Sequence, residues 1–203
     1  MSLDQWKHTL DTNLTSSFLV AREMLRGLDA PGVVDEVKDK ASIVLIGSTA
    51  GKYGEAGHAD YAATKSGEFG FSRLATYDSS PRLASLLTPR NANNIYPPFT
   101  AMMYGLTLTL KNEIVKIAPK GRVNCIAPGW VKTPMAEKTL QDKVVVQRAL
   151  ATTPLKKVAE PLDVANQILV VSSPTLSGHV SGQVIMVEGG MEGRLLNLPS
   201  DFE

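Results

Sequence analysis

Tyr61 and Lys65 stand four residues apart in the segment DYAATKS, at the start of a helical pattern. Residues four apart lie on the same face of a helix, so these two side chains are expected to be neighbours. A free tyrosine loses its proton near pH ~10, and a nearby ammonium group favours the phenolate and lowers that pKa. The pair therefore suits proton transfer to or from a carbonyl or alcohol oxygen.

Ser48 follows an apolar run at 41–46 that reads as a buried strand. Residues at the carboxyl ends of strands line the ligand crevice of open α/β sheets, where a hydroxyl can donate to the same substrate oxygen. Taken alone, this evidence is weak. A tyrosine and a lysine at this spacing more often have no catalytic role and are simply a surface tyrosine beside a solvated lysine.

The elements that must position these residues alternate between short apolar runs and amphipathic segments. The apolar runs predict strands at 41–46, 122–127 and 183–187. One helical segment, at 4–28, precedes the first strand. The others lie between the strands, from 60 onward and at 101–117, 135–150 and 161–171. This order predicts an α/β fold with a parallel, doubly wound sheet covered by helices on both faces.

Several segments together resemble the short-chain dehydrogenase/reductase family. Residues 41–66, ASIVLIGSTAGKYGEAGHADYAATKS, are similar to its active-site block, which has a strand ending in Gly-Ser, a glycine-bearing loop and Tyr-x-x-x-Lys. Asn13, in TLDTNLTSSFLVARE, is similar to the family's helix asparagine. Three downstream segments also match: RVNCIAPGWVKTPM (122–135), PLKKVAEPLDVA (154–165) and SGQVIMVEGG (181–190). The resemblance covers residues 1–66 and about 101–192.

The resemblance implies hydride transfer between NAD or NADP and a carbonyl or alcohol substrate. Tyr61 would be the general acid/base, and Lys65 would lower its pKa and bind the nicotinamide ribose. Ser48 would orient the substrate oxygen, and Asn13 would hold a water in a proton relay. The resemblance places four more residues beside the nicotinamide, namely Pro128, Gly129, Val131 and Thr133.

The cofactor phosphates would need a further unit, made of a strand, a Gly-rich turn and a helix. Family members carry this unit ahead of the helix with which these 203 residues open. The cluster Gly47, Gly51 and Gly54 follows the Ser48 strand and leads to Tyr61, so we interpret it as the substrate-side loop. We expect one incomplete, N-terminally truncated Rossmann-like domain over 1–203, with an open sheet edge and with NAD versus NADP undecided.

Residues 67–100 interrupt the pattern as a 34-residue insertion rich in turn formers. Without them, Ser66 would run straight into Ala101 as one amphipathic helix. The codons of Gly67-Glu68-Phe69 and of Phe99-Thr100-Ala101 can contain splice-like sequences. Translated intron is therefore our hypothesis, and a genuine surface insertion is the alternative. Transcripts that all retain the segment would exclude an intron.

Three classes of function follow from these residues. The leading one is an NAD(P)-dependent oxidoreductase, impaired in this chain because phosphate binding is lost and Lys65 lies next to the insertion. The alternative is a non-catalytic fragment or isoform that acts by dimerising through its long helices. A hydrolase would need a serine–histidine pair, yet the sequence has no nucleophile elbow and His8, His58 and His179 lie far apart.

Composition limits which cellular locations and which classes of binding partner are expected. The formal net charge of +1 gives no electrostatic case for nucleic acid or an anionic membrane. There is no secretory signal and no apolar run of ~18 residues, so we expect a cytoplasmic protein without a membrane partner. The single cysteine, Cys125, reads as a core thiol, and the histidines lack metal-ligand spacing. The family resemblance implies that the parent protein would be a homo-oligomer.

Substrate identity is not readable from the sequence. The family implies that it is set largely by residues 135–159, where Ala149, Leu150 and Leu155 suggest an apolar wall.

Overall fold

The computed structural model describes residues 1–66, 102–134 and 136–191. The insertion that the sequence predicts at 67–100 lies outside these described residues.

A three-stranded parallel sheet forms the centre of the described fold. Its strands are β1 (Ser42–Ile46), β2 (Arg122–Pro128) and β3 (Val184–Val187), in the spatial order β1-β2-β3. Ser42 pairs with Arg122 at one end of the β1–β2 ladder, and Ile46 pairs with Ile126 at the other. The three predicted strands and their parallel arrangement are confirmed, each within one residue at its ends.

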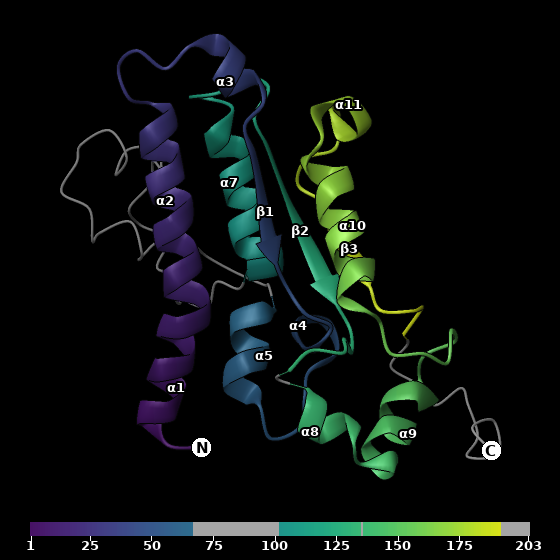
Figure 1. Cartoon of the computed structure of the whole chain (residues 1–203). Coiled ribbons are helices and arrows are strands. Elements are labelled where there is room, and N and C mark those ends of the chain that lie inside the picture. The colour runs from purple at the N-terminus through teal and green to yellow at the C-terminus, as the bar shows by residue number, and fades with distance from the viewer. Residues whose placement is uncertain (67–101, 135, 192–203) are drawn as a thin grey trace.

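Helices cover both faces of this sheet, as Figure 1 shows. On one face lie α2 (Ser16–Leu28) and α7 (Thr107–Ile114), and on the other lies α10 (Pro161–Ser172). The main core fills the first of these two layers. It includes side chains from both helices and from β1 and β2, among them Phe18, Leu25, Ile43, Leu45, Leu106, Leu110, Ile114, Val123 and Cys125. The helical faces read from the sequence are buried in their central parts, at Leu14, Phe18 and Ala21 and at Leu106, Leu110 and Ile114, whereas Leu3 at the start of the first face is exposed.

The first helical segment runs from α1 (Leu3–Leu10) through one turn of π-helix, η1 (Asp11–Thr15), into α2. Ser2 caps its start, because the Ser2 hydroxyl accepts a hydrogen bond from the Gln5 N–H at 3.1 Å. The helix ends at Leu28, so Gly27 lies inside its last turn and does not end it as the sequence suggested.

Three short helices flank β1 along the chain, one before it and two after it. The first, α3 (Asp35–Asp39), lies in the polar, charged connection before β1. Beyond β1 come α4 (Ala50–Tyr53) and α5 (Ala59–Lys65). The chain is described again from η3 (Met102–Leu106), a π-helical turn that leads into α7. In Figure 1, α5 lies end to end with α7, and α5 contacts η3.

The segment predicted as one helix at 135–150 is instead two, and that prediction was wrong. The helices are α8 (Glu137–Leu140) and α9 (Lys143–Ala151). Asp142 separates them because its carboxylate accepts hydrogen bonds from the N–H groups of Val144 and Val145, which starts a new helix. The start predicted for α10 is confirmed. A further short helix, α11 (Pro174–Ser177), was not foreseen.

The outer edge of β1 is open within the described ranges, because no described strand pairs with it. Ser42 on this strand carries a buried hydroxyl without a hydrogen-bond partner among the described residues. None of the described helices combines the length and the apolar character needed to cross a membrane.

Candidate active site at the carboxyl end of the sheet

Ser48 lies where β1 and β2 both end. Two backbone hydrogen bonds hold its neighbours to β2, from Gly47 N to Ile126 O at 2.7 Å and from Thr49 N to Pro128 O at 2.9 Å. The half-buried Ser48 hydroxyl accepts a hydrogen bond from Ala50 N at 3.2 Å, at the start of α4. The turn therefore fixes the hydroxyl at the carboxyl edge of the sheet, where the sequence predicted it.

Tyr61 and Lys65 share one face of α5. The side-chain nitrogen of Lys65 lies 5.8 Å from the centroid of the Tyr61 ring. Only 8% of Lys65 is exposed, and its amine donates a hydrogen bond to the Ile46 carbonyl oxygen at 2.8 Å. Burial lowers the pKa of this amine. The structure thus brings together the phenol and the amine of the predicted pair.

The Ile46 carbonyl also shows which side of β1 the amine occupies. Backbone groups of successive strand residues point alternately to the two edges. The Gly47 and Thr49 N–H groups point to β2, so the Ile46 carbonyl points to the open edge. The Lys65 amine therefore lies at the carboxyl end of that edge, where it bonds to a residue two positions before Ser48.

Asn13 lies in η1, which packs against α5. Its side-chain amide donates to the Thr9 carbonyl at 3.2 Å, and its own carbonyl accepts from the Ser17 hydroxyl at 2.7 Å. A single π-helical turn inside an α-helix is frequent at functional sites. The helix that carries Asn13 thus lies beside the helix that carries Tyr61.

The four residues expected beside a nicotinamide begin at the last residue of β2 and continue away from the sheet. Pro128 is next to the Ser48 turn through the hydrogen bond from Thr49. Gly129 donates to the Val187 carbonyl at 3.0 Å, and a Cβ at this position would lie 3.0 Å from Glu188 Cβ. The close approach of the β2 and β3 ends therefore favours glycine here.

Val131 and Thr133 lie farther along the same segment. Val131 pairs with Ala159 in an isolated parallel bridge, and the Thr133 carbonyl accepts from Ala136 N at 2.9 Å. Of the four residues, Pro128 is the one joined directly to the Ser48 turn by a backbone hydrogen bond given above.

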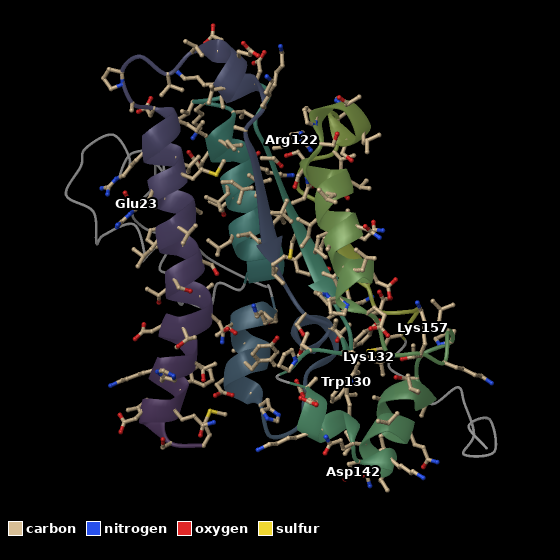
Figure 2. All side chains as sticks on the ribbon, in the orientation of Figure 1. Glu23, Arg122, Trp130, Lys132, Asp142 and Lys157 are labelled. Atoms are coloured by element: carbon tan, nitrogen blue, oxygen red, sulfur yellow. The ribbon has the colours of Figure 1, made fainter. Side chains whose placement is uncertain are left out.

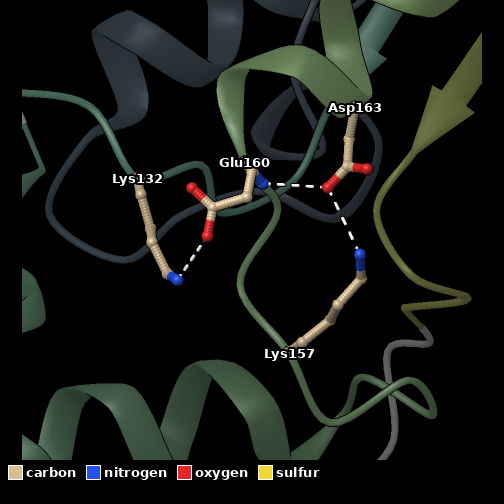
Figure 3. Close-up of polar contacts among 4 residues, drawn as sticks. All are labelled: Lys132, Lys157, Glu160 and Asp163. Carbon is tan, nitrogen blue, oxygen red and sulfur yellow. Dashed lines mark hydrogen bonds and ion pairs between the residues drawn. The ribbon is translucent and has the colours of Figure 1, made fainter.

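One ion pair holds this segment to the start of α10, and a second lies at the start of α10 itself. Figure 3 shows Lys132 paired with Glu160, and Lys157 paired with Asp163 at 3.3 Å. Asp163 also accepts from Glu160 N at 2.9 Å, which completes a capping box. These contacts fix where the chain leaves the site.

A pocket of about 190 Å³ lies beside these ion pairs. Leu150, Leu155 and Trp130 are among its apolar lining residues. In Figure 2, Trp130 lies close to Lys132 and Lys157. None of Ser48, Tyr61 and Lys65 lines the pocket, so it is separate from the catalytic candidates.

Sequence reasoning missed two residues next to the site, Thr9 and Asp60. Asp60 immediately precedes Tyr61, and only 3% of it is exposed. Its carboxylate accepts from the Thr9 hydroxyl at 2.8 Å and from the Gln5 amide at 3.4 Å. The available signal was an acidic residue in the first turn of a helix, a position that the helix dipole favours without any partner.

The glycine cluster lies where the sequence analysis placed it, between β1 and the helix of Tyr61. Gly47 follows β1, and Gly54 ends α4 with a φ of 76°. Because α4 has only four residues, it presents no long helix dipole to a phosphate.

Comparisons with known proteins agree with this geometry. A family model described as short chain dehydrogenase matches residues 1–100, and one described as Enoyl-(Acyl carrier protein) reductase matches residues 84–192. The chain therefore belongs to the short-chain dehydrogenase/reductase family, whose members are NAD(P)-dependent oxidoreductases.

Individual relatives are similar over most of this chain. The 3-oxoacyl-[acyl-carrier-protein] reductase FabG of Vibrio cholerae is 28% identical over 94% of this chain and 59% of its own length. The (3R)-3-hydroxyacyl-CoA dehydrogenase of Canis lupus familiaris is 27% identical, over 94% of this chain and 56% of its own. A crystal structure of the Brucella melitensis 3-oxoacyl-[acyl-carrier protein] reductase superimposes with a TM-score of 0.65 at 26% identity, covering 94% and 54%. The chain thus spans under three fifths of these relatives.

The donor groups at the carboxyl edge fit a nicotinamide ribose. The Lys65 amine and the Tyr61 phenol are both donors that ribose hydroxyls can accept from, and the turn that carries Ser48 is bonded to Pro128 through Thr49 N. Within the described ranges, no group of His, Cys, Asp and Glu side chains forms a potential metal site.

Proposed function

We propose that this chain carries the catalytic half of a reductase that transfers hydride between NAD(P)(H) and a carbonyl or alcohol. The observation that carries the proposal is the placement of the Lys65 amine 5.8 Å from the Tyr61 ring, at the carboxyl end of β1. The cofactor supplies the hydride chemistry when bound.

In this proposal, Tyr61 gives or takes the proton at the substrate oxygen. Ser48 donates to the same oxygen, and Lys65 holds the ribose. Asn13 supports proton exchange from the neighbouring helix, while Pro128, Gly129, Val131 and Thr133 line the nicotinamide side. Because relatives are named for 3-oxoacyl and 3-hydroxyacyl thioesters, a 3-oxoacyl thioester is the first carbonyl to test.

We further propose that cofactor binding by this chain is weak and that its turnover is therefore impaired. The candidate contacts all belong to the nicotinamide end, and the glycine cluster leads only into the four-residue α4. The adenosine half of the cofactor then adds little affinity. The choice between NAD and NADP stays open for the same reason.

A cofactor titration tests both parts of this proposal. NADH, NADPH and reduced nicotinamide mononucleotide are titrated into the chain while nicotinamide fluorescence is followed. We expect weak binding of all three, with similar affinities, and loss of binding in Lys65→Met. No binding of any of them at millimolar concentration would refute the catalytic proposal. Much tighter binding of either dinucleotide would refute only the impairment.

One observation favours a second function, in which the chain acts by association without catalysis. Exposed apolar side chains lie on α2 and α7, on the same side of the sheet, and include Leu19, Val20, Leu108 and Val115. Sedimentation of the chain beside a Val20→Lys/Val115→Lys variant tests this function. A concentration-dependent dimer in the chain but not in the variant supports it, and two monomers exclude it.

A further inference from the structure

We propose that Thr9 and Asp60 form a positioning pair that sets the placement of Tyr61 relative to Asn13. This inference rests on the proposed function, because it assigns the pair a role in the same proton transfer. Neither residue belongs to the set that the family resemblance brings to the site.

The first part of the argument is the contact between two helices. The Thr9 hydroxyl, on α1, donates at 2.8 Å to the carboxylate of Asp60, the second residue of α5. The two residues are 51 positions apart, so the bond joins separate elements. A charge-assisted bond to a buried carboxylate is stronger than a neutral one and specifies direction as well as distance.

The second part is that Thr9 also contacts Asn13. Its carbonyl accepts from the Asn13 side-chain amide at 3.2 Å, one helical turn away. Thr9 therefore bonds to Asn13 through its backbone and to the residue before Tyr61 through its side chain. A rotation or slide of α5 against α1 would break the bond to Asp60 and would change the separation of Tyr61 from Asn13.

The third part is that few other contacts can replace this one. Gln5 is the other side chain that donates to Asp60, at the longer distance of 3.4 Å. The backbone N–H groups of Asp60 and Tyr61 also bond to this carboxylate, but they belong to α5 itself and do not hold α5 to α1. Loss of the Thr9 hydroxyl is therefore expected to shift the start of α5, which is the turn that carries Tyr61.

Thr9→Val tests the pair, because valine keeps the β-branched shape and removes only the hydroxyl. Thr9→Ser restores the hydroxyl and serves as the rescue. Thr15→Val is the matched control, since Thr15 makes an exposed hydroxyl bond to Asp11 at 3.2 Å on the same helical segment.

The first readout is steady-state reduction of a 3-oxoacyl thioester, well below the melting temperature. We expect Thr9→Val to lower kcat about tenfold with unchanged KM for the cofactor, because small displacements at a reacting group cost rate. Thr9→Ser and Thr15→Val are expected to keep kcat. A kcat for Thr9→Val equal to that of the unaltered chain overturns the inference.

The second readout needs no turnover. The Tyr61 ring resonances are assigned by their loss in Tyr61→Phe and are followed by NMR in each variant. We expect them to move in Thr9→Val and to stay in Thr9→Ser and Thr15→Val. If the unaltered chain shows no reductase activity, the proposed function fails, and unmoved Tyr61 resonances in Thr9→Val would separately overturn the positioning role.

Discussion

The side-chain nitrogen of Lys65 lies 5.8 Å from the centre of the Tyr61 ring, with both residues on one face of α5. The same nitrogen reaches the Ile46 carbonyl at the end of β1. Only 8% of a lysine held in this way is exposed. This arrangement favours catalysis over stability, because burial disfavours the charged amine.

Replacing Lys65 is therefore expected to separate activity from stability. Lys65→Met keeps the length of the side chain and removes a buried amine whose pKa is lowered by burial. We expect a loss of turnover of at least ~100-fold with no decrease in the melting temperature.

Thermal melts and reductase assays of Lys65→Met check this, with Lys116→Met as the surface control. A large decrease in melting temperature for Lys65→Met alone would show that the buried lysine is structural.

The hydrogen-bonded Asp60 carboxylate should make the stability of the folded chain depend on pH in the acid range. The Thr9 hydroxyl, and next the Tyr61 N–H, hold the pKa of the Asp60 carboxyl below its ordinary value of ~3.9. The unfolded chain then binds this proton more readily than the folded chain. The stabilising contribution is complete above that ordinary value and is lost as pH falls through the folded pKa.

Urea midpoints of the chain and of Asp60→Asn across the acid range measure this contribution. The gap between them is expected to be widest above pH ~5 and to narrow below pH ~4. Asp11→Asn, on an exposed carboxylate, is the control. A gap that stays constant with pH would mean that Asp60 does not titrate as the structure requires.

Cys125 should be inert in the folded protein. The residue is fully buried, and burial raises the pKa of its thiol to about 11. At pH 8, only about one thiol in a thousand would be ionised, and a buried thiol is also shielded from reagent. Iodoacetamide labelling is expected only when denaturant opens the fold. Labelling in plain buffer at the rate of a free cysteine would contradict the buried position in β2.

Arg122 should be needed for folding and not for chemistry. Its guanidinium, which Figure 2 shows near the end of α10, donates to three carbonyls, namely those of Val171 at 2.5 Å, Ser172 at 2.8 Å and Ser177 at 3.0 Å. Arg122→Met leaves these acceptors unmet and is expected to lower the free energy of unfolding by about 2–4 kcal/mol.

Urea unfolding measures the effect of Arg122→Met. Lys120→Met, which breaks an exposed ion pair with Asp39, is the control and should lower the free energy of unfolding far less, because water screens an exposed pair. Equal losses in the two variants would argue against the buried network.

The sequence predicted the strands and the α10 start because their signals are local. The apolar run at 41–46 and the Glu160-Pro161 helix start each specify their element without distant partners. The segment at 135–150 was read as one helix because its periodicity spans the break. Only the cap formed by the Asp142 carboxylate separates α8 from α9, and an aspartate inside a helical pattern is an ambiguous signal.

The candidate site was predictable as residue types, and its supporting contacts were not. Ser48, Tyr61 and Lys65 stand out by spacing within one short block. The bond from Thr9 to Asp60 joins residues 51 positions apart, so no local sequence pattern predicts it. The acceptor for the Lys65 amine is the Ile46 backbone carbonyl, which every residue possesses and which therefore leaves no mark in the sequence.

The most direct test compares the chain with Tyr61→Phe in single-turnover reduction of a 3-oxoacyl thioester, with NADH or NADPH at millimolar concentration. The account predicts slow but measurable oxidation of at least one cofactor by the chain, and a rate at least ~100-fold lower in Tyr61→Phe with the fold intact. An unchanged rate in Tyr61→Phe, or no oxidation by a folded chain that binds the cofactor, would contradict the assignment of Tyr61 as the proton donor.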